Sequence, residues 1–285
     1  MAFNRVVELS VGKNPPSDGV VLDNLHIDFR VTRTVTFSGN TAEISIYNSA
    51  ETTRNDFIVK GNNVILKAGY EDETVGIIFV GQVDRVTTMK KGATLETKIN
   101  ATSTRAENKP LEQVIIATSY AADTPVSAVI SEIANALGLA VFGIENATGI
   151  KMTNGFTDAA KAKDVLYKAR NILKTQDVDL FIDNNQLVIY KLKGRSSIFQ
   201  AAYLDDTCGL LSFGPLEENR DEDAEKVSTK KKIQFECLLN HAIKPNSVVT
   251  LKTVDGTNSY LIDSVEFSGN NYGGDFKCTC EAAIE

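Results

Sequence analysis

Tryptophan is absent from the 285-residue sequence, histidine occurs only twice, and the four cysteines all lie in the last third. Small secreted scaffolds are dense in cysteine, so this usage indicates reduced thiols and synthesis in a cytoplasm. The first residues have neither a long apolar core nor a cleavage motif, and we therefore expect no signal peptide. The longest nearly apolar stretch, residues 136–144, is far shorter than the ~20 residues of a membrane-spanning helix, which predicts no membrane insertion.

An excess of basic residues is also missing. Lysine and arginine total 30 against 37 aspartate and glutamate residues, giving a net charge of −7 and an isoelectric point of about 5.1. Proteins that bind nucleic acids are usually basic, so we expect no stable nucleic-acid binding. Hydrophobic residues make up 42% of the chain and charged residues 24%, a balance typical of a globular protein with a substantial core.

No recognised catalytic motif occurs. His26 lies on the polar face of an expected strand and His241 follows a strand end, and neither has a nucleophile or carboxylate partner at a catalytic spacing. Nucleophile elbows, phosphate-binding glycine loops and zinc-protease helices are missing as well. The sequence therefore predicts a protein that is not an enzyme, with no catalytic, cofactor-binding or metal-binding residues and no cofactor. Two carboxylates that meet in space to cleave a sugar remain an alternative.

The cysteines offer a metal site as a second alternative. Cys278 and Cys280, with Cys237 and His241, could supply four ligands. The single residue between the paired cysteines fits no standard zinc spacing. Cys278 and Cys280 are in phase with Phe276 along an expected strand, and free cysteine packs as a small hydrophobe. The pattern therefore favours core cysteines.

The first third of the chain is predicted to form strands. Residues 25–37 alternate strictly, with apolar side chains and Arg33 at odd positions and polar side chains at even positions. This period of two places one face in a core and the other in water. Further strands are expected at 42–46, 64–70, 77–86 and 95–101, separated by turn residues. Short strands divided by turns indicate a sandwich or barrel.

The middle of the chain has helical patterning. Apolar residues recur at helical spacing over 126–137, with Thr124 as the expected N-cap, Pro125 in the first turn and Gly138 as the stop. A second helix is expected over 162–173. A hairpin at 178–190 follows, turned by Asp183, Asn184 and Asn185. These elements predict a small α+β domain.

The last third returns to strands, at about 233–237, 249–251, 260–262 and 276–282. Their order echoes that of 64–101, and residues 95–101 have the phase of 276–282. We interpret this as a weak internal repeat. The predicted fold is mainly β with an α+β insert: two related tube-like β-barrel domains at 1–110 and 204–285, which can share strands, flank a helical α+β domain at 111–203.

A run of mixed, mainly acidic charge covers residues 217–226, and three lysines follow at 230–232. Such a run is typical of a solvated loop. The functional alternative is a loop at a subunit interface or facing a channel.

Several phrases together resemble the baseplate hub proteins of phage tails, which are related to the late-control D family and to the base of type VI secretion spikes. The phrases follow one another over nearly the whole chain at 42–48, 64–70, 78–83, 208–211, 235–240, 245–249 and 260–262. Asn246 stands where the family often has glycine, and His241 where proline is common. Both are turn positions.

The resemblance implies a virion structural protein of the tail baseplate, synthesised in the bacterial host cytoplasm. Members form a homotrimeric ring in which each chain contributes two tube-like β domains. The ring adapts the sixfold tail tube to the threefold central spike. Implied partners are further copies of the chain, a tail tube or tube-initiator protein, the central spike protein and other baseplate proteins. The alternatives are a tail-associated cell-wall hydrolase and a distal tail or tube protein with direct sixfold symmetry.

Overall fold

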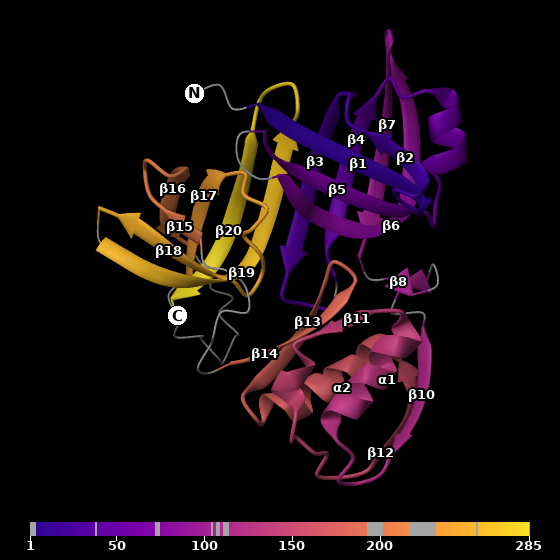
Figure 1. The fold of residues 1–285 in the computed structure, drawn as a ribbon, viewed down its shortest axis with the longest axis vertical. Coiled ribbons are helices and arrows are strands. Elements are labelled where there is room, and N and C mark those ends of the chain that lie inside the picture. Colours follow the sequence, from indigo (N-terminus) through magenta and orange to yellow (C-terminus); the bar gives the residue numbers. More distant parts are fainter. Residues whose placement is uncertain are drawn as a thin grey trace, which may run out of the picture.

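Antiparallel strands dominate the computed structural model, and a segment with two longer helices interrupts them in the middle of the chain (Figure 1). The structure describes residues 4–37, 39–71, 75–103, 105–106, 109–110, 114–192, 202–216, 232–254 and 256–284. The predicted class, mainly β with an α+β insert, is confirmed. Within these residues, no helix has the length and apolar character needed to cross a membrane.

Strands of the two β halves come from the beginning and the end of the chain. The first half contains β1 (Arg5–Asn14), β2 (Asp18–Leu22), β3 (Ile27–Thr34), β4 (Thr41–Tyr47), a π-helical turn (Thr53–Phe57), β5 (Asn63–Tyr70), β6 (Val75–Lys91) and β7 (Thr94–Thr102). The second half contains β15 (Ala202–Leu204), β16 (Leu210–Pro215), β17 (Lys232–Leu238), β18 (Val248–Thr253), β19 (Gly256–Asn270) and β20 (Phe276–Ile284).

The α+β insert lies between them. A short hairpin, β8 (Arg105–Ala106) and β9 (Lys109–Pro110), leads to β10 (Ile115–Tyr120), α1 (Val126–Leu137), β11 (Ala140–Phe142), a 3-10 turn (Ile144–Ala147), β12 (Phe156–Lys161), α2 (Ala162–Lys174), β13 (Val178–Asp183) and β14 (Gln186–Lys191). The helices pack on the sheet β11-β14-β13 and on the pair β10-β12 around their own apolar core.

Both helices and the hairpin were predicted and are confirmed, but the start of α1 differs. The N-cap is Pro125, which has an extended backbone, and no side chain caps the helix. Thr124 instead donates its hydroxyl to the carbonyl of Ala121, because it belongs to the turn before the helix. Gly138 ends α1 with a φ of 65°, the left-handed conformation that glycine adopts without steric cost.

Both β halves belong to one sheet. Its order is β16-β17-β20-β19-β3-β4-β7-β6-β5-β1-β2, and β18 joins β19 with β15 beside it. The halves meet where residues 264–270 of β19 pair antiparallel with residues 28–34 of β3. Among the described residues this path does not return on itself, so the halves share an open sheet in place of two closed barrels. The 15 residues of β19 are enough to serve both halves.

The two halves repeat one strand order. Five strands of the first half lie in the order β3-β4-β7-β6-β5, and five of the second lie in the order β16-β17-β20-β19-β18. The registers correspond as well. Ala101 of β7 pairs with β4 and β6 at the places where Ala282 of β20 pairs with β17 and β19. The interpretation of the sequence echo as an internal repeat is thus supported by the topology.

Each repeat also contains the same irregularities. A β-bulge interrupts the pairing of β6 with β7 at Asp84 and that of β19 with β20 at Asp263. Gly61 and Asn246 have positive φ angles of 92° and 64°. Each donates its N–H to the carbonyl of the residue before the bulge, at 2.9 and 2.8 Å. Asparagine tolerates the left-handed conformation that this turn requires, which explains Asn246 at a position where glycine is expected.

The strands of both halves bury a common core. The alternation predicted for residues 25–37 is present in β3, where Ile27, Phe29 and Val31 face inward. A single apolar cluster extends from β1 and β5 through β3 and β4 to β17, β19 and β20. Because β19 and β3 pair edge to edge, this core continues from one half into the other.

Candidate functional site

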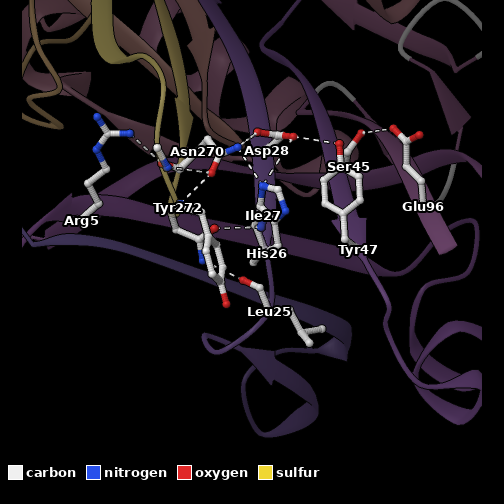
Figure 2. Close-up of polar contacts among 12 residues, drawn as sticks. Arg5, Leu25, His26, Ile27, Asp28, Ser45, Tyr47, Glu96, Asn270 and Tyr272 are labelled. Carbon is white, nitrogen blue, oxygen red and sulfur yellow. Dashed lines mark hydrogen bonds and ion pairs between the residues drawn. The ribbon is translucent and has the colours of Figure 1, made fainter. Parts of the chain in front are cut away.

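A polar cluster surrounds the start of β3 (Figure 2). The side-chain amide of Asn270, at the end of β19, donates to Asp28 and lies 2.8 Å from Nε2 of His26. The phenol of Tyr47 in β4 donates to the other oxygen of Asp28 at 2.9 Å, and the His26 ring stacks on the Tyr47 ring with centroids 4.4 Å apart. Arg5 of β1 donates to the carbonyl of Asn270 at 3.0 Å. The cluster therefore ties β1, β3 and β4 to the end of β19.

The electrostatics of this cluster suit a structural brace. Burial, followed by the hydrogen bond to Asp28, raises the pKa of Tyr47 to about 12. Both carboxylate oxygens of Asp28 already accept hydrogen bonds from protein donors. The sequence placed His26 and Asp28 together on a polar strand face but missed Asn270 and Tyr47. Only the pairing of β19 with β3 brings Asn270 into reach.

A groove of about 350 Å³ lies beside the cluster, lined in part by Asp28, Arg30, Glu43 and Lys98. Lys98 forms an ion pair with Glu43 at 2.6 Å. The hydrogen bond from Lys98 is the largest influence on Glu43 and lowers the pKa of this carboxyl. A carboxylic acid that protonates a glycosidic oxygen needs a raised pKa. The pKa of Glu43 is thus shifted in the direction opposite to that required of a sugar-cleaving acid.

A buried ion pair joins the β sheet to the insert. Arg33 of β3, 1% exposed, donates Nε to Asp183 Oδ1 at 3.0 Å and Nη2 to Oδ2 at 2.5 Å. Asn40 donates its amide to Asp183 at 2.8 Å and to Asn184 at 3.1 Å. Asn184 Oδ1 also accepts the N–H of Val80 in β6 at 3.1 Å. The hairpin turn of the insert is therefore held by β3, β6 and the residue just before β4 in the first half.

The ion pair was not predicted, although the sequence contained a signal for it. Arg33 occupies an apolar phase of the 25–37 alternation, and a charge at such a position needs a buried partner. The partner is 150 residues away in the hairpin turn. Asn184 and Asn185 have φ angles of 45° and 62°, typical of a two-residue type I′ turn, and this turn presents Asp183 to the sheet.

Three of the four cysteines are buried, as the strand phase predicted: Cys237, Cys278 and Cys280 are each 0% exposed. Burial raises the pKa of Cys278 well above its usual value. Cys208 is exposed in the turn before β16. His241, proposed with them as a metal ligand, lies with its ring against the backbone of Gly76 in β6. The predicted acidic loop, 217–226, lies outside the described residues, as do the first two lysines of the 230–232 run.

Besides the outer edges of β2 and β15, the edges of two more strands in the sheet lack a partner within the described part of the chain. β16 pairs only with β17, and β6 beyond its bulge pairs only with β7. Apolar side chains are exposed at both: Met89 of β6 and Leu211 of β16 are each 52% exposed, and Phe213 is 36% exposed. Exposed edges with apolar side chains are ready-made pairing sites for another chain. These edges are the candidate assembly surface.

Solved structures with this fold come from phage tails and a related secretion system. A tail protein of Neisseria meningitidis MC58 matches with a TM-score of 0.67 and 9% identity, over 99% of this chain and 97% of that one. The 43 kDa tail protein of prophage MuSo2 from Shewanella oneidensis matches with a TM-score of 0.67 and 12% identity, over 98% of each chain.

An E. coli component of the type VI secretion system, described as similar to bacteriophage T4 tail proteins, matches with a TM-score of 0.62 and 10% identity, over 92% of this chain and 74% of that chain. At these identities the likeness establishes the fold, which is that of phage tail proteins. No curated protein matches the sequence.

The family follows from the sequence itself. The chain belongs to the family described as baseplate hub gp41, whose sequence model matches residues 6–282. The resemblance to baseplate hub proteins is thereby confirmed, and the protein has a structural role in a phage tail baseplate.

Proposed function

We propose that the protein is the hub of the baseplate, and that three copies form a ring that adapts the sixfold tail tube to the threefold central spike. The observation behind this proposal is the repeated strand order, β3-β4-β7-β6-β5 and β16-β17-β20-β19-β18. Three chains with two equivalent β units each present six similar units around an axis. Such a ring can face a sixfold structure on one side and a threefold one on the other.

In this proposal, residues 1–110 and 204–285 form the ring, and residues 111–203 brace it from outside. The buried pair between Arg33 and Asp183 supports a fixed position for the brace. The ring contacts the tail tube or a tube-initiator protein, the central spike and other baseplate proteins. The protein acts without catalysis or a cofactor, after synthesis in the host cytoplasm.

Copy number tests the proposal directly. Native mass measurement of the purified protein, alone and with its spike partner, should give three chains per particle. A cryo-EM map of intact tails should show one hub ring of three chains on the tail axis. Six copies in one ring, or one copy remote from the axis, would contradict the proposal. Lysis of peptidoglycan by the purified protein would favour the cell-wall hydrolase instead.

A further inference from the structure

The joint between the two halves shows how one β unit of this fold binds the next. Residues 264–270 of β19 pair antiparallel with residues 28–34 of β3, and Phe267 lies opposite Val31. Phe29 of β3 lies at this joint and is only 5% exposed. A complete joint therefore has a paired strand edge and buried aromatic side chains.

The internal repeat maps this joint onto the unpaired edges of β6 and β16. Counted from the bulges at Asp84 and Asp263, residues 85–91 of β6 correspond to residues 264–270 of β19. The registers with β4 and β17 likewise make β16 the counterpart of β3, with Pro215 at the place of Val31. Labels β16 and β6 lie toward opposite sides of the molecule in Figure 1. One chain thus contains the two separated halves of a second joint.

The backbone of β6 has free hydrogen-bonding groups at this edge. The N–H of Asn48 donates to the carbonyl of Leu95 at 2.7 Å, so the odd-numbered residues of β7 bond to β4 and the even-numbered ones to β6. Beyond the bulge, the even-numbered residues of β7 pair with odd-numbered residues of β6. The N–H and C=O groups of Val86, Thr88 and Lys90 consequently point away from β7.

The side chains at β16 are those of an incomplete joint. Phe213 occupies the place of Phe29, because their partners in β17 and β4 correspond, but it is 36% exposed against 5%. Leu211 beside it is 52% exposed. A strand laid along β16, as β19 lies along β3, would cover the Phe213 ring.

A hollow beside β6 marks the other side of the joint. It has a volume of about 800 Å³ and is lined by residues that include Val59, Asp84 and Arg85. The counterpart of Val59 in the second half is Lys244. Its ammonium group interacts electrostatically with Arg33 of β3 and with Asp183. In the second half, residues of β3 therefore lie beside the space that corresponds to this hollow. Next to β6, among the described residues, the space has no such strand beside it.

We infer that residues 212–215 of β16 of one chain pair antiparallel with residues 88–91 of β6 of a second copy, in the register of the internal joint. This inference rests on the proposed hub, since it specifies how the three chains are joined. It places Met89 opposite Gly214 and Lys90 opposite Phe213. Pro215 falls opposite Thr88 and has no N–H to donate, so this residue pair has one ladder hydrogen bond fewer than the corresponding pair of the internal joint, Phe267 with Val31. Three such contacts and the three internal joints together give six similar joints around the ring.

Cysteine pairs test the register. In a background with the exposed Cys208 changed to serine, Met89→Cys with Gly214→Cys should form a disulfide between chains. This pair lies where the two strands do not exchange hydrogen bonds, and there Cα atoms are only about 4.5 Å apart. A methyl added at Gly214 meets nothing within 4 Å, so the change itself is tolerated. The matched control is Arg30→Cys with Ser268→Cys, the corresponding pair of the internal joint, which should oxidise within one chain.

The outcomes separate the interface from the hub. Linked species that stop at three chains support both. A ladder that continues past three supports the pairing and contradicts the trimeric hub. A particle of three chains by mass whose Met89→Cys/Gly214→Cys variant stays unlinked, while the control oxidises, overturns the pairing and leaves the hub standing. No link in either purified protein or assembled tails, with the control oxidised, also overturns the pairing.

A proline at the edge of β6 gives a second test. Thr88→Pro removes an N–H that points away from β7, so it leaves the internal ladder intact and removes a donor from the joint. Thr88→Val keeps the N–H and serves as the control. At a protein concentration where the Thr88→Val variant is fully trimeric, the Thr88→Pro variant should be mainly monomeric with an unchanged circular dichroism spectrum. Equal trimer fractions in the two folded variants would contradict the pairing.

Discussion

At the scale of single residues, Arg33 and Asp183 fix the insert against the sheet. Their side chains are 1% and 9% exposed, so both charges have lost most of their water. The two ion-pair hydrogen bonds and the amide of Asn40 offset this cost. A buried pair is expensive to break because the remaining charge has no partner.

Asp183→Ala should therefore lower the free energy of unfolding by about 3–5 kcal/mol, measured by urea denaturation. Glu43→Ala removes the acid of the exposed Lys98–Glu43 pair and should cost about 1 kcal/mol or less. Replacing both partners, as Arg33→Met with Asp183→Leu, should cost less than either single change. A loss below about 1 kcal/mol for Asp183→Ala would show that Arg33 is satisfied by other groups.

The thiols provide a second residue-scale prediction. Cys208 is exposed, whereas Cys237, Cys278 and Cys280 are fully buried, and burial raises the pKa of Cys278. Because the thiolate is the reactive form, a thiol-specific disulfide reagent should titrate one thiol per native chain and four in denaturant. In the Cys208→Ser variant the native value should fall to zero. Elemental analysis should find no zinc, and one zinc per chain that disappears in a Cys280→Ser variant would contradict the assignment of core cysteines.

At the scale of elements, the repeated turn and bulge position the two long strands. Gly61 and Asn246 accept the same left-handed backbone, and each anchors the residue before a bulge. Bulges bend a strand and increase its twist locally. The bulges at Asp84 and Asp263 divide β6 and β19 into a first part, which pairs with β5 or β18, and a second part, which pairs with β7 or β20. The other edge of the second part pairs with β3 in β19 and has no partner among the described residues in β6.

Gly61→Ala should lower the free energy of unfolding by about 1–2 kcal/mol, since a side chain in this conformation meets the following carbonyl. Asn246→Gly introduces no such clash, because glycine adopts the left-handed conformation without steric cost. It should change the free energy of unfolding by less than about 1 kcal/mol. Thermal denaturation of the two variants measures the difference. Equal destabilisation would mean that the two turns do not have equivalent roles.

At the scale of the whole molecule, net charge bears on the proposed ring, whose open axis would have to let DNA pass. A net charge of −7 per chain becomes −21 for three chains, by multiplication. Each phosphate that a protein neutralises adds salt-dependent affinity, which would retard the passage of DNA. A ring with a negative net charge is consistent with a conduit that does not retain DNA.

The purified ring should accordingly show no saturable binding of a fluorescent DNA duplex in an anisotropy titration. The measurement is made at about 50 mM and about 150 mM salt, the range in which phosphate contacts give strong, salt-dependent binding. A basic DNA-binding protein of similar size serves as the positive control. Tight binding at the higher salt would contradict the conduit and leave the trimer untouched.

The local elements were accessible from the sequence because their signals are local. The alternation over 25–37, the helical spacing over 126–137 and the 183–185 turn each depend on neighbouring residues, and each element is present. The phase shared by residues 95–101 and 276–282 revealed the repeat for the same reason. Thr124 was misjudged because a turn and a helix start both favour threonine, and the preceding backbone decides between them.

The sequence alone thus determined the class of elements, the inserted α+β segment and the family. The tertiary structure decided which distant groups meet: Asn270 with Asp28, Arg33 with Asp183, and β19 with β3. These contacts span 150 to 242 residues, and no spacing rule encodes such a separation. Whether the sheet closes depends on the partner that each strand edge finds. A single chain leaves the edges of β6 and β16 open, because their complement is not within its own described residues.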